Sequence, residues 1–193
     1  RVIDNLQEPS VKKGFIFEKA SSRQTHIIFE YVSPKYSIEE SVALEILRNY
    51  LSYGYSSLLK QEVRTGRGLA YNISAGINLY QDASMFFIQT ATTKPKESIE
   101  IILNIMRKLN KSFTPEIFDE LKEQTASIFT REINDPFSEL GFLGKGWLLY
   151  GKIISPEEFL KILEKINYKD VIDAVNKYLS EDHLFIAALG EEE

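Results

Sequence analysis

A strict alternation of side chains between Leu69 and Tyr80 constrains the fold of this chain more than any other feature of its sequence. Apolar residues stand at every second position, and mostly small or polar residues stand between them. A period of two residues is the period of a β-strand, in which successive side chains point to opposite faces of the sheet. A turn at 81–84 and an apolar run at 85–93 follow, which predicts a hairpin. Regular alternation from Leu69 places Tyr71 on the inward face.

Three further segments have the patterns of strands. They are residues 14–18, 24–33 and 183–190. In the second of these, Ile27, Phe29 and Tyr31 share one face, and His26 and Glu30 share the other.

Helical segments fill most of the rest of the chain, and several begin at a capping residue. Ser37 opens the first in a capping box with Glu40. The others are expected at 56–63, along the stripe 99–109, from 114, at 135–150, from 155 and at 168–179. Paired strands with helices gathered in blocks predict an α+β fold, a mostly antiparallel sheet with helices packed on one face. Residues 1–13 are expected to be a linker or entry arm, and 14–193 a single domain.

The composition argues against several kinds of partner and site. The net charge of −5 argues against nucleic acid, which is normally bound by a basic face. No run approaches the roughly 20 apolar residues of a membrane span. The sequence holds no cysteine, which suits the cytoplasm and leaves no thiolate metal site. Position 1 is arginine and no signal peptide is visible, so we expect a fragment or a processed chain.

Several kinds of active site lack their residues here. The two histidines, His26 and His183, lie in separate predicted strands and outside any His-x-x-Glu-His motif or its inverse, so no zinc site of that type is expected. There is no Gly-x-Ser-x-Gly elbow for a nucleophilic serine. Gly66 and Gly68 precede a strand, whereas a phosphate loop places its glycines before a helix. We therefore expect neither metal nor cofactor in this chain.

Arg64, Arg67 and Tyr71 crowd the junction between a predicted helix and the alternating strand. From periodicity alone, Tyr71 fits a core position with a satisfied hydroxyl, and Arg64 fits a cation at a helix C-terminus. The single tryptophan, Trp147, stands in an apolar helix, where packing in the core is expected and an interface is the alternative.

Motifs along nearly the whole chain resemble a known family. The strand "RQTHIIFEY" contains a Gln-x-His motif at Gln24 and His26, and "RTGRGLAY", "MFFIQTATTKPKE" and "LFIAALG" follow at matching separations. Together they resemble the non-zinc-binding, C-terminal-type half of the pitrilysin-type (inverzincin) zinc metallopeptidases. That family includes insulin-degrading enzyme and the mitochondrial processing peptidase. The "RTGRGLAY" motif is the most specific of the four.

The resemblance implies a processing-peptidase-like half of a clamshell. In such enzymes one half carries zinc on an inverted His-x-x-Glu-His motif, and the other half lends an arginine and a tyrosine that stand seven positions apart. Arg64 and Tyr71 have this spacing, and Arg67 is expected to be structural. The resemblance gives Tyr71 the role of a donor to the oxyanion or the substrate, and Arg64 the role of gripping substrate carbonyls. An inward Tyr71 fits this role if the sheet ends where its inward face opens to the chamber.

The expected function is that of a substrate-binding, zinc-free half, inactive alone, in a zinc metalloendopeptidase. Its expected partners are an extended or unstructured peptide and a homologous zinc-bearing half, in the same chain or as a second subunit, with a dimer among the assemblies that the family allows. Zinc is expected in the companion half. Two alternatives remain open: a non-proteolytic structural or assembly subunit of the same family, and a free-standing peptide-binding module.

Overall fold

The protein has one five-stranded sheet in the computed structural model, which describes residues 13–66 and 68–191 and, within them, the side chains of all but residues 64, 65 and 71. The strands are β1 (Gly14–Lys19), β2 (Thr25–Pro34), β3 (Ala70–Leu79), β4 (Ala83–Thr92) and β5 (Leu184–Gly190). Their order across the sheet is β1-β5-β2-β4-β3. Only the β1–β5 pair is parallel. The predicted mostly antiparallel sheet is therefore confirmed.

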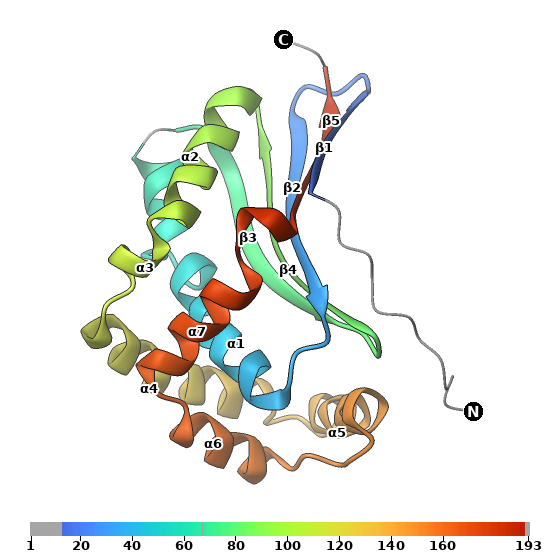
Figure 1. Ribbon diagram of the computed structural model, residues 1–193, viewed down its shortest axis with the longest axis vertical. Coiled ribbons are helices and arrows are strands. Elements are labelled where there is room, and N and C mark those ends of the chain that lie inside the picture. The colour runs from blue at the N-terminus through green and yellow to red at the C-terminus, as the bar shows by residue number, and fades with distance from the viewer. Residues whose placement is uncertain (1–12, 67, 192–193) are drawn as a thin grey trace.

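Helices gather on one face of this sheet, as Figure 1 shows, and this confirms the predicted α+β class. They are α1 (Ile38–Ser52), α2 (Pro95–Arg107), α3 (Leu109–Ser112), α4 (Pro115–Glu132), α5 (Pro136–Tyr150), α6 (Pro156–Lys165) and α7 (Tyr168–Tyr178), with a π-helical turn η1 (Lys60–Thr65) and a 3₁₀ turn η2 (Glu181–His183). We call the sheet face under the helices the covered face and the other the open face. Within the described part of the chain, no helix has the length and apolar character needed to cross a membrane.

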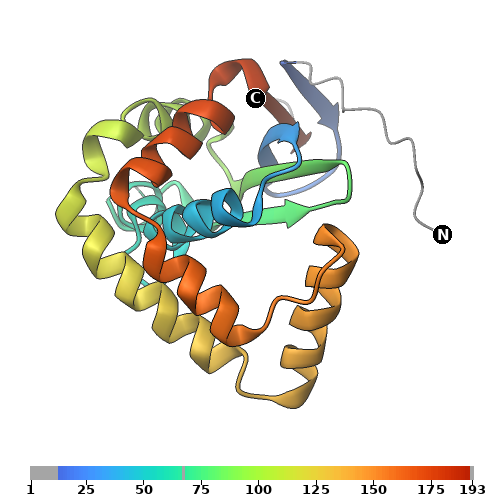
Figure 2. The ribbon, with the colours of Figure 1, turned by 60° about the horizontal axis from the view of Figure 1, so that its bottom comes forward.

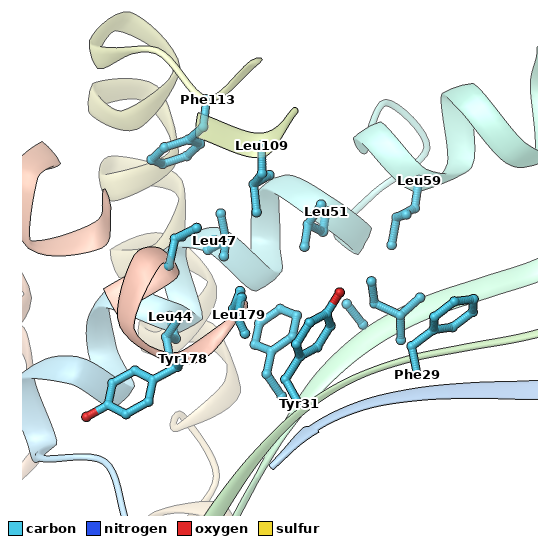
Figure 3. Packing of buried hydrophobic residues seen from close by; sticks show 14 of the residues in the cluster. Phe29, Tyr31, Leu44, Leu47, Leu51, Leu59, Leu109, Phe113, Tyr178 and Leu179 are labelled. Atoms are coloured by element: carbon cyan, nitrogen blue, oxygen red, sulfur yellow. The ribbon is translucent and has the colours of Figure 1, made fainter. Parts of the chain in front are cut away.

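The core lies between the covered face and α1. Figure 3 shows Phe29 and Tyr31 of β2 beneath Leu44, Leu47 and Leu51 of α1, all of them almost completely buried. Each such side chain contributes roughly 1.5–3 kcal/mol by leaving water. This layer holds β2 and its neighbours in a fixed register, because a slip by one residue would turn the apolar side chains to the other face.

Helix boundaries follow the capping residues seen in the sequence. The Ser37 hydroxyl accepts from the Glu40 N–H at 3.1 Å, and the Glu40 carboxylate accepts from the Ser37 N–H at 2.8 Å. This confirms the predicted capping box. The expected helix along 99–109 is divided instead, because the backbone leaves the helical conformation at Lys108. Similarly, His183 lies in η2 rather than in the last strand.

Trp147 is not part of the core, contrary to the prediction. Its side chain is 60% exposed on α5, and Leu148 beside it is 66% exposed. The helix is apolar on more than one side, so periodicity could not tell which side would be buried. Phe142 and Gly146 turn inward, and α5 stands at the margin of the helical layer in Figure 2. The interface alternative for Trp147 stays a prediction.

Candidate functional site

The segment between η1 and β3 leaves regular helical geometry before it enters the sheet. In η1 the Gly66 N–H donates to the Gln61 carbonyl at 2.7 Å, which closes a wider turn than that of an α-helix. A Cβ atom on Gly66 would lie 2.9 Å from that carbonyl oxygen, so only glycine fits without a shift. Leu59 and Val63 are fully buried and fix the turn on the core. Single π-helical turns of this kind occur frequently at functional sites.

Gly68 and Thr92 direct the chain from this turn into β3. Gly68 has a φ of +62°, a conformation that glycine adopts without the steric cost of a side chain. Leu69 is then held through both its backbone groups: its N–H donates to the Val63 carbonyl at 3.0 Å, and its carbonyl accepts from the Thr92 hydroxyl at 2.6 Å. Glycine is therefore required at these two positions for different reasons: a close approach of the backbone at Gly66 and a positive φ at Gly68.

A β-bulge interrupts the alternation at the start of β3. Ala70 pairs with Thr92 and Asn72 pairs with Ala91, so Tyr71 is an additional residue opposite β4. Ala70 is 5% exposed and pairs with a fully buried threonine, whereas regular alternation placed it on the opposite face from Ile73. The alternation that placed Tyr71 inward does not continue across the bulge. Bulges are common beside active sites, where they redirect a side chain.

The structure describes the backbone of two of the predicted site residues but none of their side chains. The backbone of Arg64 lies in η1 and that of Tyr71 in the bulge of β3. Their side chains, and Arg67 entirely, lie outside the described residues. The roles of Arg64 and Tyr71 therefore stay predictions. Sequence reasoning missed Thr92, which holds the Leu69 carbonyl next to this junction; a threonine at a predicted strand end gives no signal of such a contact.

A hollow on the open face lies beside the bulge. It has a volume of about 510 Å³, and its lining includes Asn72, His26 and Gln89 over an apolar floor with Ile28 and Ala187. Strand pairing joins Asn72 to Ala91, Ala91 to His26, His26 to Leu189 and Leu189 to Glu18, so this row crosses all five strands. As predicted, His26 and Glu30 turn away from the face that carries Phe29. The hollow therefore adjoins the start of β3, where the bulge lies.

The described residues do not fit a zinc ion. Within 13–66 and 68–191, no three histidine, cysteine, aspartate or glutamate side chains lie close enough to share a metal. His26 pairs with Leu189, near the end of β5, while His183 precedes the start of that strand. About 20 Å separates positions six residues apart along a strand. These two histidines therefore cannot ligate one ion, and no chemical step is assigned to a metal on this chain.

Comparison with known proteins identifies the family. Residues 4–125 match the family model described as "Peptidase M16 inactive domain". The chain is 25% identical over 181 residues to the protein named "Uncharacterized zinc protease YmxG" of Bacillus subtilis, a match that covers 92% of this chain and 44% of that protein. The chain thus spans less than half the length of this relative.

Solved structures share the fold. A structure from Pseudomonas fluorescens, titled as a peptidase M16 inactive domain, superposes with a TM-score of 0.80 at 21% identity, over 97% of this chain and 46% of that one. A chain of complex III2 from Candida albicans superposes with a TM-score of 0.78 at 13% identity, over 91% of this chain and 45% of that one. The match to the family model confirms the resemblance read from the motifs: the chain belongs to the peptidase M16 inactive-domain family, the non-zinc-binding half of the pitrilysin-type zinc peptidases.

Proposed function

We propose that this chain is the substrate-binding, zinc-free half of a clamshell zinc metalloendopeptidase, in which Arg64 and Tyr71 act on the peptide. The observation that carries the proposal is the junction between η1 and β3. A π-helical turn, a glycine with positive φ and a β-bulge follow one another over twelve residues, from Lys60 to Tyr71. Such irregularities reduce stability, and they concentrate where a protein must orient functional groups.

Tyr71 would donate a hydrogen bond to the carbonyl oxygen of the scissile peptide bond. A tyrosine hydroxyl has a pKa of about 10 in water, so it is a neutral donor at physiological pH. Its hydrogen bond strengthens as the carbonyl oxygen gains negative charge, and this difference lowers the barrier. The attacking water would be activated by a zinc ion held in a companion half.

Arg64 would hold the substrate backbone near that bond. Its planar guanidinium has five donors in a fixed arrangement and stays charged at any physiological pH. Two peptide carbonyls accepting from it would fix the direction of an extended chain. Orientation of this kind removes part of the entropic barrier to reaction.

The test uses the whole protein that carries this half, with an unstructured fluorogenic peptide, with and without a chelator. Tyr71→Phe should reduce kcat by about 10²–10³-fold, the usual effect of losing one oxyanion donor. Tyr80→Phe is the matched control, because Tyr80 lies 48% exposed just beyond the opposite end of β3. It should leave kcat unchanged. Circular dichroism of both variants shows whether folding is intact.

The outcomes distinguish the proposed peptidase half from a structural or assembly subunit. If wild type cleaves in a chelator-sensitive way and Tyr71→Phe cleaves equally well, the peptidase stands but the tyrosine has no part in it. Failure of the wild type to cleave any peptide would favour the second candidate, a structural or assembly subunit. The fold shared with a chain of complex III2 supports that candidate, since that chain is part of a larger assembly.

A further inference from the structure

One transverse row of the open face differs from all the others. Strand pairing aligns Gly14 with Phe185, Phe185 with Glu30, Glu30 with Phe87 and Phe87 with Gly76, so the row crosses all five strands. We call it the Glu30 row. It places one carboxylate at the centre of the sheet, one phenylalanine on each side of it, and a glycine at each edge.

The two phenylalanine rings lean away from the carboxylate. A Cβ atom on Gly76 would lie 2.4 Å from Cζ of Phe87, and one on Gly14 would lie 3.0 Å from Cε2 of Phe185. Each ring therefore extends over the glycine on its outer side, which only a residue without a side chain permits. The rings therefore lie on either side of Glu30 and turned away from it. Rings packed over glycines are a known means of fixing aromatic side chains on a sheet.

Glu30 has no counter-charge in the described part of the chain. No described residue forms a hydrogen bond or an ion pair with it. Partial burial raises the pKa of Glu30, because the surrounding apolar side chains disfavour the ionised carboxylate. The open-face positions of the five strands include no lysine or arginine. A positive partner for this carboxylate must therefore come from outside the sheet.

We propose that the Glu30 row is a subsite for a basic side chain of the peptide substrate, with Glu30 pairing to its guanidinium or ammonium group and Phe87 and Phe185 flanking its apolar stem. The chemistry of the row selects this occupant. Arginine and lysine carry a long apolar stem below a cationic head, which suits a carboxylate with an aromatic ring on either side. Aromatic faces beside a cation add attraction. A purely apolar occupant would leave the carboxylate desolvated and unpaired, which is costly.

The position of the row predicts where the basic residue stands. Glu30 lies four residues along β2 from His26, whose row reaches Asn72 beside the Tyr71 bulge. Four residues of extended chain span roughly 13 Å. A peptide running along the strands with its scissile bond near Tyr71 would thus place the residue about four positions from that bond over Glu30. This inference rests on the proposed function, since it assumes that the peptide contacts the open face.

The test compares two peptides that differ in one side chain. One carries arginine four positions from the bond that the cleavage assay identifies as the scissile bond. The other carries citrulline there, which is neutral but nearly the same shape. Their Kd values are measured with the whole protein in the presence of chelator, so that binding is seen without cleavage. Wild type should prefer arginine by roughly 5–20-fold, as expected for a partly desolvated charge-assisted pair. Moving the arginine by two positions along the peptide should remove the preference.

Two variants decide the role of Glu30. Glu30→Gln should reduce the arginine preference to less than about twofold, because only the charge is lost. Glu100→Gln is the control, since Glu100 is an exposed carboxylate on α2, in the helical layer and away from the open face. It should keep the preference. Gly76→Ala gives an independent check, because its methyl group displaces the Phe87 ring from β3 and should weaken arginine binding.

Each other outcome overturns the subsite. Equal affinity of wild type for both peptides, with cleavage intact and sensitive to Tyr71→Phe, leaves the proposed function standing and removes this inference. If Glu30→Gln instead changes the oligomeric state on size-exclusion chromatography, the row is a contact between protein segments. A wild type that neither binds nor cleaves either peptide would contradict the proposed function itself.

Discussion

Two neighbouring rows of the sheet, one residue apart in register, have opposite characters. On the covered face, Phe29 pairs with Ile186 and Ile88, and Ile88 with Ala75, and all four are at most 8% exposed. Over the same four strands of the open face, the Glu30 row has the same pairings one position along, with two phenylalanines, the Glu30 carboxylate and Gly76. Both rows contain large apolar side chains, yet only the first is enclosed by helices.

The difference shows that apolar content alone does not identify a core. In the covered row every side chain packs against others, so its sequence must satisfy the close packing of a protein interior. The open row retains a carboxylate that pairs with none of the residues the structure describes, and two rings lying over glycines. A surface that served only stability would have no need of that charge. We therefore expect substitutions in the covered row to change stability and those in the open row to change binding.

The largest expected effect separates Phe29→Ala from Phe87→Ala. Phe29 is fully buried, so its truncation leaves a cavity and should lower the free energy of unfolding by about 3–5 kcal/mol. Phe87 is only partly buried, and its loss should cost no more than about 1–2 kcal/mol. Urea unfolding of the whole protein, followed by far-UV circular dichroism, measures both. Equal losses would mean that the open face is enclosed in the folded protein, and the comparison would fail.

Thr92→Val should have the second-largest effect on stability, because it leaves three buried polar groups on the covered face without a hydrogen bond. The Thr92 hydroxyl donates to the Leu69 carbonyl at 2.6 Å and accepts from the Lys94 N–H at 2.9 Å and the Ser98 hydroxyl at 3.0 Å. Valine has the same shape but offers none of these bonds, so stability should fall by about 1–3 kcal/mol.

The same substitution tests whether the covered face positions the site. Loss of the Thr92 contact frees the carbonyl next to the bulge, and we expect kcat for peptide cleavage to fall while the far-UV spectrum at low temperature stays native. Thr125→Val is the matched control, since the Thr125 hydroxyl is equally buried but accepts from the Asn49 amide at 2.9 Å and donates to the Leu121 carbonyl at 2.7 Å, within the helical layer. Equal effects of the two on kcat would show that Thr92 stabilises the sheet without orienting the junction.

Glycines on the two faces should respond differently to an added methyl group. On the covered face, a Cβ on Gly190 would lie 2.7 Å from the Cα atom of Thr25, so backbone must move, and Gly190→Ala should cost about 1–3 kcal/mol. On the open face, the Cβ on Gly76 meets the far end of the Phe87 ring, which can rotate. Gly76→Ala should therefore change stability by less than about 1 kcal/mol. Thermal unfolding of the two variants compares them directly, and a larger loss at Gly76 would show that the ring is locked.

The sequence predicts the covered face better than the open one, for a physical reason. Burial of one face imposes the period of two on β2, and the free N–H groups at the start of α1 favour the capping box; the sequence predicts both correctly. The bulge at Tyr71 could not be predicted, because Leu69, Ala70 and Tyr71 are successive apolar or aromatic residues that fit either phase of the alternation. Nor could the pairing of Glu30 with Phe87 and Phe185, since the three come from strands far apart in the sequence. Arg64 and Tyr71 were found by the motif alone, and their roles await the cleavage assay.

The smallest expected effect is a pH-dependent gain in stability from Glu30→Gln. Burial raises the folded-state pKa of Glu30 above its ordinary value of 4.5, so the folded protein binds the proton more tightly than the unfolded chain does. Stability therefore falls as pH rises through the window between the ordinary value and the raised one, because the ionised carboxylate is poorly solvated only in the folded state. Above that window Glu30→Gln should be more stable than wild type, by less than about 1 kcal/mol for a half-buried group, and below it the two should coincide. Urea midpoints from pH 3.5 to 8 measure this, with Glu18→Gln reporting the effect of net charge alone. A gain that persisted in acid would mean that glutamine packs better for reasons unrelated to charge, and the open row would lose the feature that distinguishes it from the covered one.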